Sequence, residues 1–86
     1  MRRTVNRVDS IGQPIATGDP VILREVPEYL VRDLPLEEQD AIRLQKGKTF
    51  EIASFDDQGY VELEFSDDQQ MLHTIWVKPS CLEKQP

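Results

Sequence analysis

Apolar and polar residues alternate most regularly between residues 60 and 65. Val61, Leu63 and Phe65 fall on one face of this segment, and Tyr60, Glu62 and Glu64 fall on the other. Because successive side chains of a β-strand point to opposite sides, the alternation predicts a strand with one buried face. The pair Phe50 and Ile52 has the same period, and the polar stretch 56–59 between the two runs ends in a glycine that suits a tight turn. The region 50–65 is therefore predicted to be a β-hairpin.

A third strand is predicted from residues 71 to 77, after a polar turn at residues 66–70. The alternation places Met71, His73, Ile75 and Val77 on the inward face, and Leu72, Thr74 and Trp76 on the outward face. Pro79 ends this strand because proline has no N–H to donate to the ladder. Residues 79–82 are predicted to form a tight helical turn that returns Leu82 to the core.

The elements before residue 47 are less regular. Residues 21–23 follow the turn residues Gly18-Asp19-Pro20 and predict a strand of about five residues. Pro27 and Pro35 exclude a central strand from the long connection. Residues 35–44 predict a helix of about two to three turns, with the proline in its first turn and Asp33 as the candidate N-cap.

Four or five short strands with one short helix inserted in the long connection predict an all-β fold. A small, closed or nearly closed antiparallel barrel is expected, because closure removes exposed strand edges. The barrel domain is expected to span residues 18–83. Residues 1–17 are expected to be a partly ordered N-terminal tail with at most one short edge strand, and residues 84–86 a C-terminal tail.

Length and charge narrow the possible functions of this chain. An 86-residue domain buries only roughly 60% of its unfolded surface, so a deep internal active site is not expected. No apolar run is long enough for a membrane-spanning helix, and no secretory signal follows the basic start. Together with the single cysteine, this predicts a cytoplasmic protein. The net charge of −6 makes nucleic acid an unexpected partner, unless Arg2, Arg3 and Arg7 act as a separate arm.

Four segments together resemble a small SH3-like barrel. They are Gly18-Asp19-Pro20-Val21, Lys46-Gly47-Lys48-Thr49-Phe50, the hairpin residues 57–65, and Val77-Lys78-Pro79-Ser80-Cys81-Leu82. The resemblance is to short stand-alone bacterial SH3-like proteins of uncharacterised function, some of which lie beside toxin genes. It implies about five strands and a long loop, here expanded by the helix. The paired tryptophans and tyrosine-rich first strand of peptide-binding SH3 domains are missing, so proline-rich ligands are not expected.

The candidate binding residues are one aromatic side chain and a group of carboxylates. Trp76 is either an outward-facing interface anchor or a cover for one end of the core. Six acidic residues are expected to lie together, because two turns and the outer face of one strand should meet: Asp56, Asp57, Glu62, Glu64, Asp67 and Asp68. They form either a solvated face or a docking surface for a basic partner.

Enzymatic and metal-dependent functions have little support in the sequence. His73 lacks a second positioned group for catalysis and lacks enough neighbouring ligands for a metal. Cys81 has Lys78 and Lys84 nearby, but a buried cysteine in a closing turn is the commoner case. The turn at residues 56–59 does not have the alternating ligands of a calcium loop. No cofactor or metal is expected, and the protein is not expected to be an enzyme.

The leading hypothesis is a non-enzymatic protein-interaction module. Its binding residues are expected to be Trp76, Tyr60, Glu62, Glu64, Asp56 and Asp57. Its partner is expected to be another protein, with a basic protein as the candidate class. An immunity-type inhibitor that occludes a basic toxin or nuclease is one alternative. The other is a nucleic-acid-associated or ribosome-associated barrel that uses the N-terminal arginines as an arm.

Overall fold

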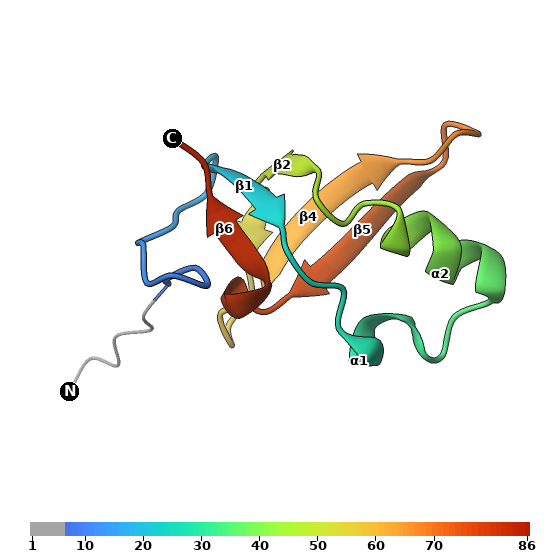
Figure 1. Ribbon diagram of the computed structural model, residues 1–86, viewed down its shortest axis with the longest axis horizontal. Helices are drawn as coiled ribbons and strands as arrows, with labels where there is room; N and C mark the ends of the chain where they lie inside the picture. Colours follow the sequence, from blue (N-terminus) through green and yellow to red (C-terminus); the bar gives the residue numbers. More distant parts are fainter. Residues whose placement is uncertain (1–6) are drawn as a thin grey trace.

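The computed structural model describes residues 7–86 of the 86-residue chain. Within this range the chain forms two three-stranded antiparallel sheets, and two short helices lie in the connection after the first strand (Figure 1). The elements in chain order are β1 (Pro20–Leu23), α1 (Glu28–Val31), α2 (Leu36–Arg43), β2 (Thr49–Glu51), β3 (Ser54–Phe55), β4 (Val61–Ser66), β5 (Leu72–Val77), the 3-10 turn η1 (Pro79–Cys81) and β6 (Leu82–Lys84). The mostly-strand composition fits the predicted small all-β fold.

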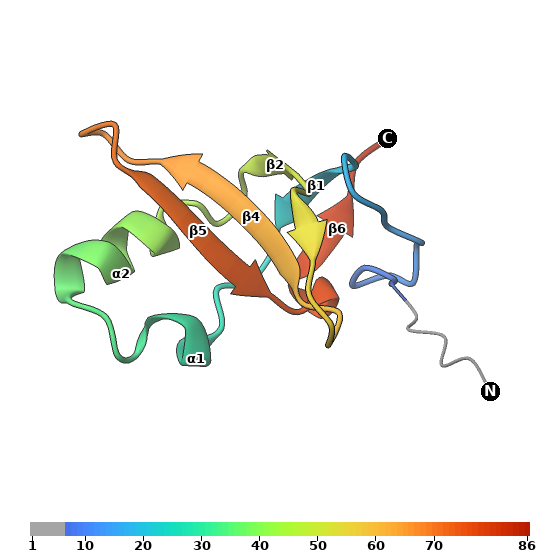
Figure 2. The same ribbon diagram turned by 180° about the vertical axis from the view of Figure 1, so that it is seen from behind.

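The strands do not close into the predicted barrel. The first sheet has the order β2-β1-β6 and the second has the order β3-β4-β5, with no ladder between β5 and β6 among the described residues. After β5 the chain enters η1 at Pro79, which cannot donate a ladder hydrogen bond, and β6 then pairs with β1 instead. Figure 2 shows the second sheet from behind, with β5 at its margin. The described residues form six strands, not about five.

The chain changes sheets at Ile52 and Ala53. Ile52 N–H donates to Asp19 O (3.0 Å) and its carbonyl accepts from Gly18 N–H (2.8 Å), both on the side of β1. Ala53 N–H donates to the carbonyl of Glu62 in β4 (3.0 Å). The predicted hairpin over residues 50–65 is therefore wrong in its first strand, because the chain bends at this point. β2 pairs with β1, and only β3 forms the hairpin with β4.

The core lies between the inner faces of the two sheets. The period-two pattern is confirmed on β4 and β5: Val61, Leu63, Phe65, Ile75 and Val77 are all buried. Met71 was predicted to face inward, but it is 61% exposed. It precedes β5 and belongs to the turn, where its N–H donates to the Asp67 carboxylate (2.9 Å).

The long connection contains two helices rather than the single predicted one. The predicted helix corresponds to α2, and α1 is an additional single turn. Pro35 is the N-cap residue of α2, so the prediction that Asp33 caps the helix is wrong. No side chain among the described residues caps this end of α2, although the Gln39 side chain donates Nε2–H to the carbonyl of Leu34 (2.8 Å). Each helix buries one side chain in the core, namely Val31 from α1 and Ile42 from α2.

Residues 7–17, which the sequence assigns to a tail, make specific contacts with the sheets, while residues 1–6 lie outside the described part. Ile15 is only 4% exposed and belongs to the core. Ser10 N–H donates to Leu82 O (2.8 Å), and the Asp9 carboxylate accepts the N–H of Lys84 (2.7 Å). These bonds attach the N-terminal segment to β6.

Three turns of this chain have the same construction around an aspartate. In each, the aspartate Oδ1 accepts the N–H groups of the residues two and four positions later: Asp9 from Ile11 and Gln13, Asp56 from Gln58 and Tyr60, and Asp67 from Gln69 and Met71. The residue three positions after each aspartate has a positive φ, which is 85° at Gly12, 85° at Gly59 and 63° at Gln70. The third turn therefore places a glutamine where the other two have glycine.

Replacing Gln70 with glycine should stabilise the protein. A side chain in the left-handed region costs about 1–2 kcal/mol, and glycine avoids this cost at the expense of some unfolded-state entropy. We expect Gln70→Gly to raise the free energy of unfolding by about 0.5–1 kcal/mol in urea denaturation. Gly59→Ala, which makes the opposite change in the matching turn, should lower it. Equal effects of the same sign from the two variants would contradict this account of the turns.

Asp9 should make the free energy of unfolding depend on pH in the acidic range. Burial raises the pKa of Asp9, but the backbone N–H groups of Lys84, Gln13, Ile11 and Gly12 lower it by more in total, so the net pKa lies below its usual value. Its contribution is therefore complete above the unfolded-state pKa of about 3.9 and is lost as the pH falls through the lower folded-state value.

Asp9→Asn should lose about 1.5–3 kcal/mol at pH 7, because the new amide cannot accept every N–H that the carboxylate accepts. Its stability should also fall less steeply than that of the wild type between about pH 5 and pH 2. Denaturation at a series of pH values measures both effects. The control Asp33→Asn alters an exposed carboxylate and should change stability by less than about 0.5 kcal/mol.

Candidate functional site

The candidate site is the outer face of the β3-β4-β5 sheet. The register places these side chains on it: Ser54 from β3, Glu62, Glu64 and Ser66 from β4, and Leu72, Thr74 and Trp76 from β5. Neighbours across the β4-β5 ladder are Glu62 with Trp76, Glu64 with Thr74, and Ser66 with Leu72. The outer face thus combines carboxylates on one strand with two large apolar side chains on the next.

Trp76 lies on the surface of the protein. It is 38% exposed and stands directly across from Glu62 in the β4-β5 ladder, while Glu64 is its diagonal neighbour. Side chains at such positions are close enough to interact, especially when one of them is aromatic. Of the two sequence-based alternatives for Trp76, the geometry agrees with the exposed position beside the two glutamates.

Glu62 is held in place, whereas Glu64 is free to meet a partner. The Ser54 hydroxyl donates a 2.6 Å hydrogen bond to Oε1 of Glu62, which is half-buried. Glu64 is exposed and has no side-chain hydrogen bond or ion pair within the described residues. The outer face therefore presents one hydrogen-bonded carboxylate and one exposed carboxylate without a side-chain partner among the described residues near Trp76.

Tyr60 belongs to an aromatic pair that the sequence analysis missed. The rings of Tyr60 and Tyr29 meet edge to face, with centroids 6.3 Å apart. Tyr29 lies in α1, and its hydroxyl accepts the N–H of Lys78 at 3.3 Å. Burial raises the pKa of Tyr29, so the phenol stays protonated near neutral pH. No periodic pattern in the long connection identifies Tyr29, because its role depends on contacts distant in sequence.

The two predicted site aspartates have different roles. Asp56 uses its carboxylate to accept the N–H groups of Gln58 and Tyr60, so it shapes the turn. Asp57 is exposed, and no side-chain bond to it is found in the described part of the chain. The pair therefore contributes one free carboxylate at the Trp76 end of the sheet.

The six acidic residues do not form one cluster. The turn with Asp56 precedes β4 and the turn with Asp67 and Asp68 follows it, so the two turns lie at opposite ends of a six-residue strand. At the rise of an antiparallel strand this separation is roughly 20 Å. The expectation that both turns meet beside the outer face is thus wrong. Of the four turn aspartates, only Asp56 and Asp57 lie at the end that carries Trp76.

The basic arm of the alternative hypothesis is described only at Arg7. Its guanidinium carbon lies 4.3 Å from the centroid of the Phe55 ring, a cation–π contact. Arg2 and Arg3 lie outside the described residues. The described part of the arm therefore packs against β3.

His73 lies in β5 and bonds to the turn that follows β4. Its Nε2 lies 2.9 Å from Oδ2 of Asp67, and its ring stacks on Phe65 with centroids 4.9 Å apart. This hydrogen bond, followed by the N–H of Met71, lowers the pKa of Asp67. Between residues 7 and 86, no group of three or more His, Cys, Asp or Glu side chains is arranged to hold a metal. The contacts of His73 are those of a structural residue.

Comparisons with protein-family models, curated proteins and solved structures found no match to this chain. No helix within residues 7–86 has the length and apolar character needed to cross a membrane. The functional assignment is therefore argued from the geometry of the chain itself.

Cys81 should be unreactive in the folded protein. The side chain is buried in η1, and burial, followed by the charge of Glu25, raises the pKa of the thiol. Because the thiolate is the reactive form, we expect labelling by a disulfide reagent such as DTNB to be slow at pH 7.5 and rapid after unfolding in urea. Fast labelling without denaturant would contradict the buried position. The variant Ser80→Cys, placed on the neighbouring and more exposed residue, supplies a reactive control.

Proposed function

We propose that this protein is a non-enzymatic protein-interaction module that binds its partner through the outer face of the β3-β4-β5 sheet. The observation that carries the proposal is the position of Trp76, which is exposed and directly opposite Glu62 in the ladder. Tryptophans dominate many interfaces because they bury a large area with few rotatable bonds. A tryptophan beside carboxylates suits a partner with an apolar site and neighbouring Lys or Arg residues.

The charge of the surface favours a basic partner. The whole chain carries a net charge of −6, and the side chains nearest Trp76 on the outer face include Glu62 and Glu64. Charge complementarity of this kind mainly accelerates association and selects among partners, while the buried aromatic contact determines how long a complex lasts. The partner class proposed is thus a basic protein.

Two of the proposed binding residues, Tyr60 and Glu62, are already held by contacts within the protein. Tyr60 is held against Tyr29, whose hydroxyl is bonded to the backbone of Lys78. Glu62 is oriented by Ser54. Side chains that are fixed before binding lose less conformational entropy on association, which supports this region as a binding surface.

The proposal includes an SH3-like arrangement and a cytoplasmic location. Three features support the SH3-like fold: the long connection after β1, the strand that bends from one sheet to the other, and the 3-10 turn before the final strand. The unpaired, buried Cys81 is compatible with a reducing compartment.

An affinity capture from cell lysate tests the outer face. We expect the immobilised wild type to retain a basic protein at low salt, and Trp76→Ala to weaken its affinity by roughly 30-fold, as for other central aromatic anchors. Glu64→Lys should weaken retention chiefly by slowing association. The matched control is Asp33→Lys, which makes the same charge change in the connection between α1 and α2 and should retain the partner.

Two results would contradict the proposal. One is the absence of any retained protein at low salt. The other is a partner whose retention is unchanged by both Trp76→Ala and Glu64→Lys.

A further inference from the structure

Strand β5 has an open edge. It is the last strand of the β3-β4-β5 sheet, and among the described residues no strand pairs with its other side. Its sequence, Leu72-His73-Thr74-Ile75-Trp76-Val77, contains no proline, glycine, aspartate, glutamate, lysine or arginine. Edge strands normally carry such residues to prevent pairing with other chains. The strand itself lacks such residues, and α1 lies beside it at the end where Tyr29 accepts the N–H of Lys78.

The hydrogen-bond pattern identifies which backbone groups face the open edge. Asp67 N–H donates to Met71 O, which makes these two residues a hydrogen-bonded pair of the antiparallel ladder. Because such pairs alternate with non-hydrogen-bonded pairs, residues 73, 75 and 77 bond to β4. The N–H and C=O groups of Leu72, Thr74 and Trp76 therefore point away from β4.

Lys78 provides an independent check of this direction. It continues the series of even-numbered residues, and its N–H donates to the hydroxyl of Tyr29 in α1 rather than to β4. Tyr29 thus occupies the edge at the end of β5. Within the described part of the chain, the backbone atoms of residues 72–77 form hydrogen bonds only in the β4-β5 ladder.

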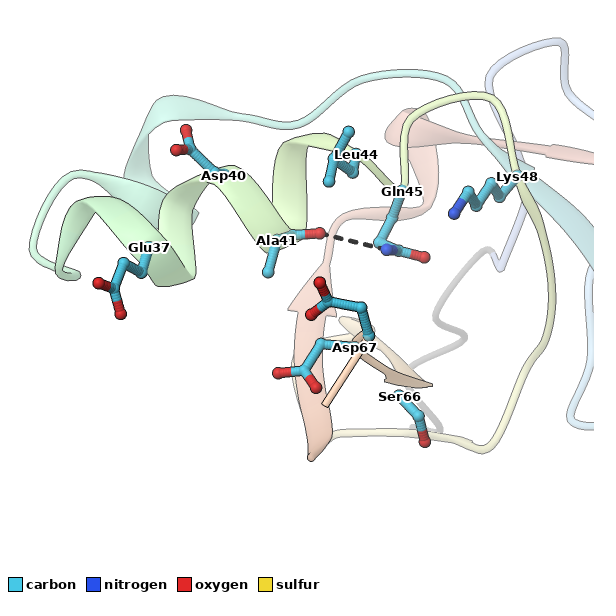
Figure 3. Close-up of a pocket in the computed structure, with 9 residues that line it drawn as sticks. Glu37, Asp40, Ala41, Leu44, Gln45, Lys48, Ser66 and Asp67 are labelled. Atoms are coloured by element: carbon cyan, nitrogen blue, oxygen red, sulfur yellow. Dashed lines mark hydrogen bonds between the residues drawn. The ribbon is translucent and has the colours of Figure 1, made fainter. Parts of the chain in front are cut away.

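The beginning of β5 borders an acidic cleft. Figure 3 shows this cleft, which lies between α2 and the turn after β4 and has a volume of about 540 Å³. The charged lining consists of the carboxylates of Glu37, Asp40, Asp67 and Asp68 and one cation, Lys48, so carboxylates are in excess. An adjoining hollow reaches Met71 and His73 at the start of β5. Exposed apolar surface from Leu44 and Met71 adjoins the carboxylates. The chemistry of the cleft suits cationic side chains with long apolar stems.

We propose that the edge of β5 binds an extended, basic segment of a partner protein as an added strand. The backbone of the segment would bond to Leu72, Thr74 and Trp76, and its Lys or Arg side chains at one end would enter the acidic cleft. This inference rests on the proposed function, because it specifies how the same partner binds. Side chains on one face of the added strand would also contact Leu72, which is 65% exposed, and Trp76.

A basic segment fits the edge better than a second copy of this chain. Each copy carries a net charge of −6, so pairing two copies brings two acidic bodies together. A basic strand instead neutralises Glu37, Asp40 and Asp68. Self-association is nevertheless a distinct outcome that the experiment below detects.

Amide hydrogen exchange of the free protein, followed by NMR, tests the edge itself. The N–H groups of Leu72, Thr74 and Trp76 should exchange at least roughly tenfold faster than those of His73, Ile75 and Val77, since only the latter are bonded within the sheet. Uniform protection along β5 would overturn the proposal. Protection of the even-numbered amides that rises with protein concentration, together with a dimer in sedimentation equilibrium, would replace the basic segment by a second copy.

A peptide titration tests the added strand. The probe is a capped peptide of alternating lysine and valine, about seven residues long, and it should slow exchange at Leu72, Thr74 and Trp76 by roughly tenfold at saturation. One control is the same peptide with N-methyl groups on alternate residues, which keeps the charge but removes the donors of one edge. The other is a peptide of alternating glutamate and valine. Neither control should protect these amides.

The variant Thr74→Pro tests the same edge from the protein side. It removes the central outward N–H and leaves the bonds of residues 73 and 75 to β4 in place. We expect it to abolish peptide binding, whereas Thr74→Val should bind as the wild type does. If Thr74→Pro does not fold, the N-methylated peptide still decides the question.

The results separate this inference from the proposed function. Equal binding of the parent and N-methylated peptides, with resonance shifts at Glu62 and Glu64, would overturn strand addition and leave the outer face as the binding surface. Absence of any shift up to the solubility limit of the lysine-valine peptide would overturn strand addition as well. Protection of the three edge amides, combined with lysate capture unaffected by Trp76→Ala, would support strand addition and contradict the role of Trp76.

Discussion

The bend at Ile52 and Ala53 is the constraint on which the rest of the structure depends. Ile52 exchanges two backbone hydrogen bonds with the segment before β1, and Ala53 bonds to β4. One continuous piece of chain therefore belongs to both sheets and sets their inner faces against each other. Ile52 is only 1% exposed, so the bend also fills the space where the sheets meet. Without it, two three-stranded sheets of this size would each leave an apolar face in water.

Three of the 16 acidic residues of this chain serve mainly to accept backbone N–H groups. Asp9, Asp56 and Asp67 each accept several backbone N–H groups inside a turn, and Asp9 also joins the N-terminal segment to Lys84. The bonds of Asp9 are partly buried, where an N–H without a partner is costly, whereas those of Asp56 and Asp67 are exposed and fix the conformation of their turns. The number of acidic residues in the sequence therefore overestimates the number of carboxylates that are available to bind a basic partner. The carboxylates that remain available to a partner include Glu64 on β4, the acidic residues of α2, and Asp57 and Asp68 in the turns.

Local periodicity predicted β4 and β5 well, because alternation over six residues with one buried face leaves little choice of structure. The bend at Ile52 was missed because the alternation of Phe50 and Ile52 continues into it without a glycine or proline. The place of Tyr29 and the anchoring of Asp9 depend on partners 49 and 75 residues away, at Lys78 and Lys84. Contacts over such distances leave no periodic signal in the sequence, and only the folded chain shows them.

The geometry of β5 makes the outer face and the open edge parts of a single surface. Side chains alternate between the two faces of a strand, and backbone N–H groups alternate between its two edges, both with a period of two residues. In β5 the two alternations coincide. Leu72, Thr74 and Trp76 direct their side chains to the outer face and their backbone groups to the open edge. A segment that adds to this edge would therefore meet Trp76 through both backbone and side chain, whereas a partner resting only on the outer face would meet the side chain alone.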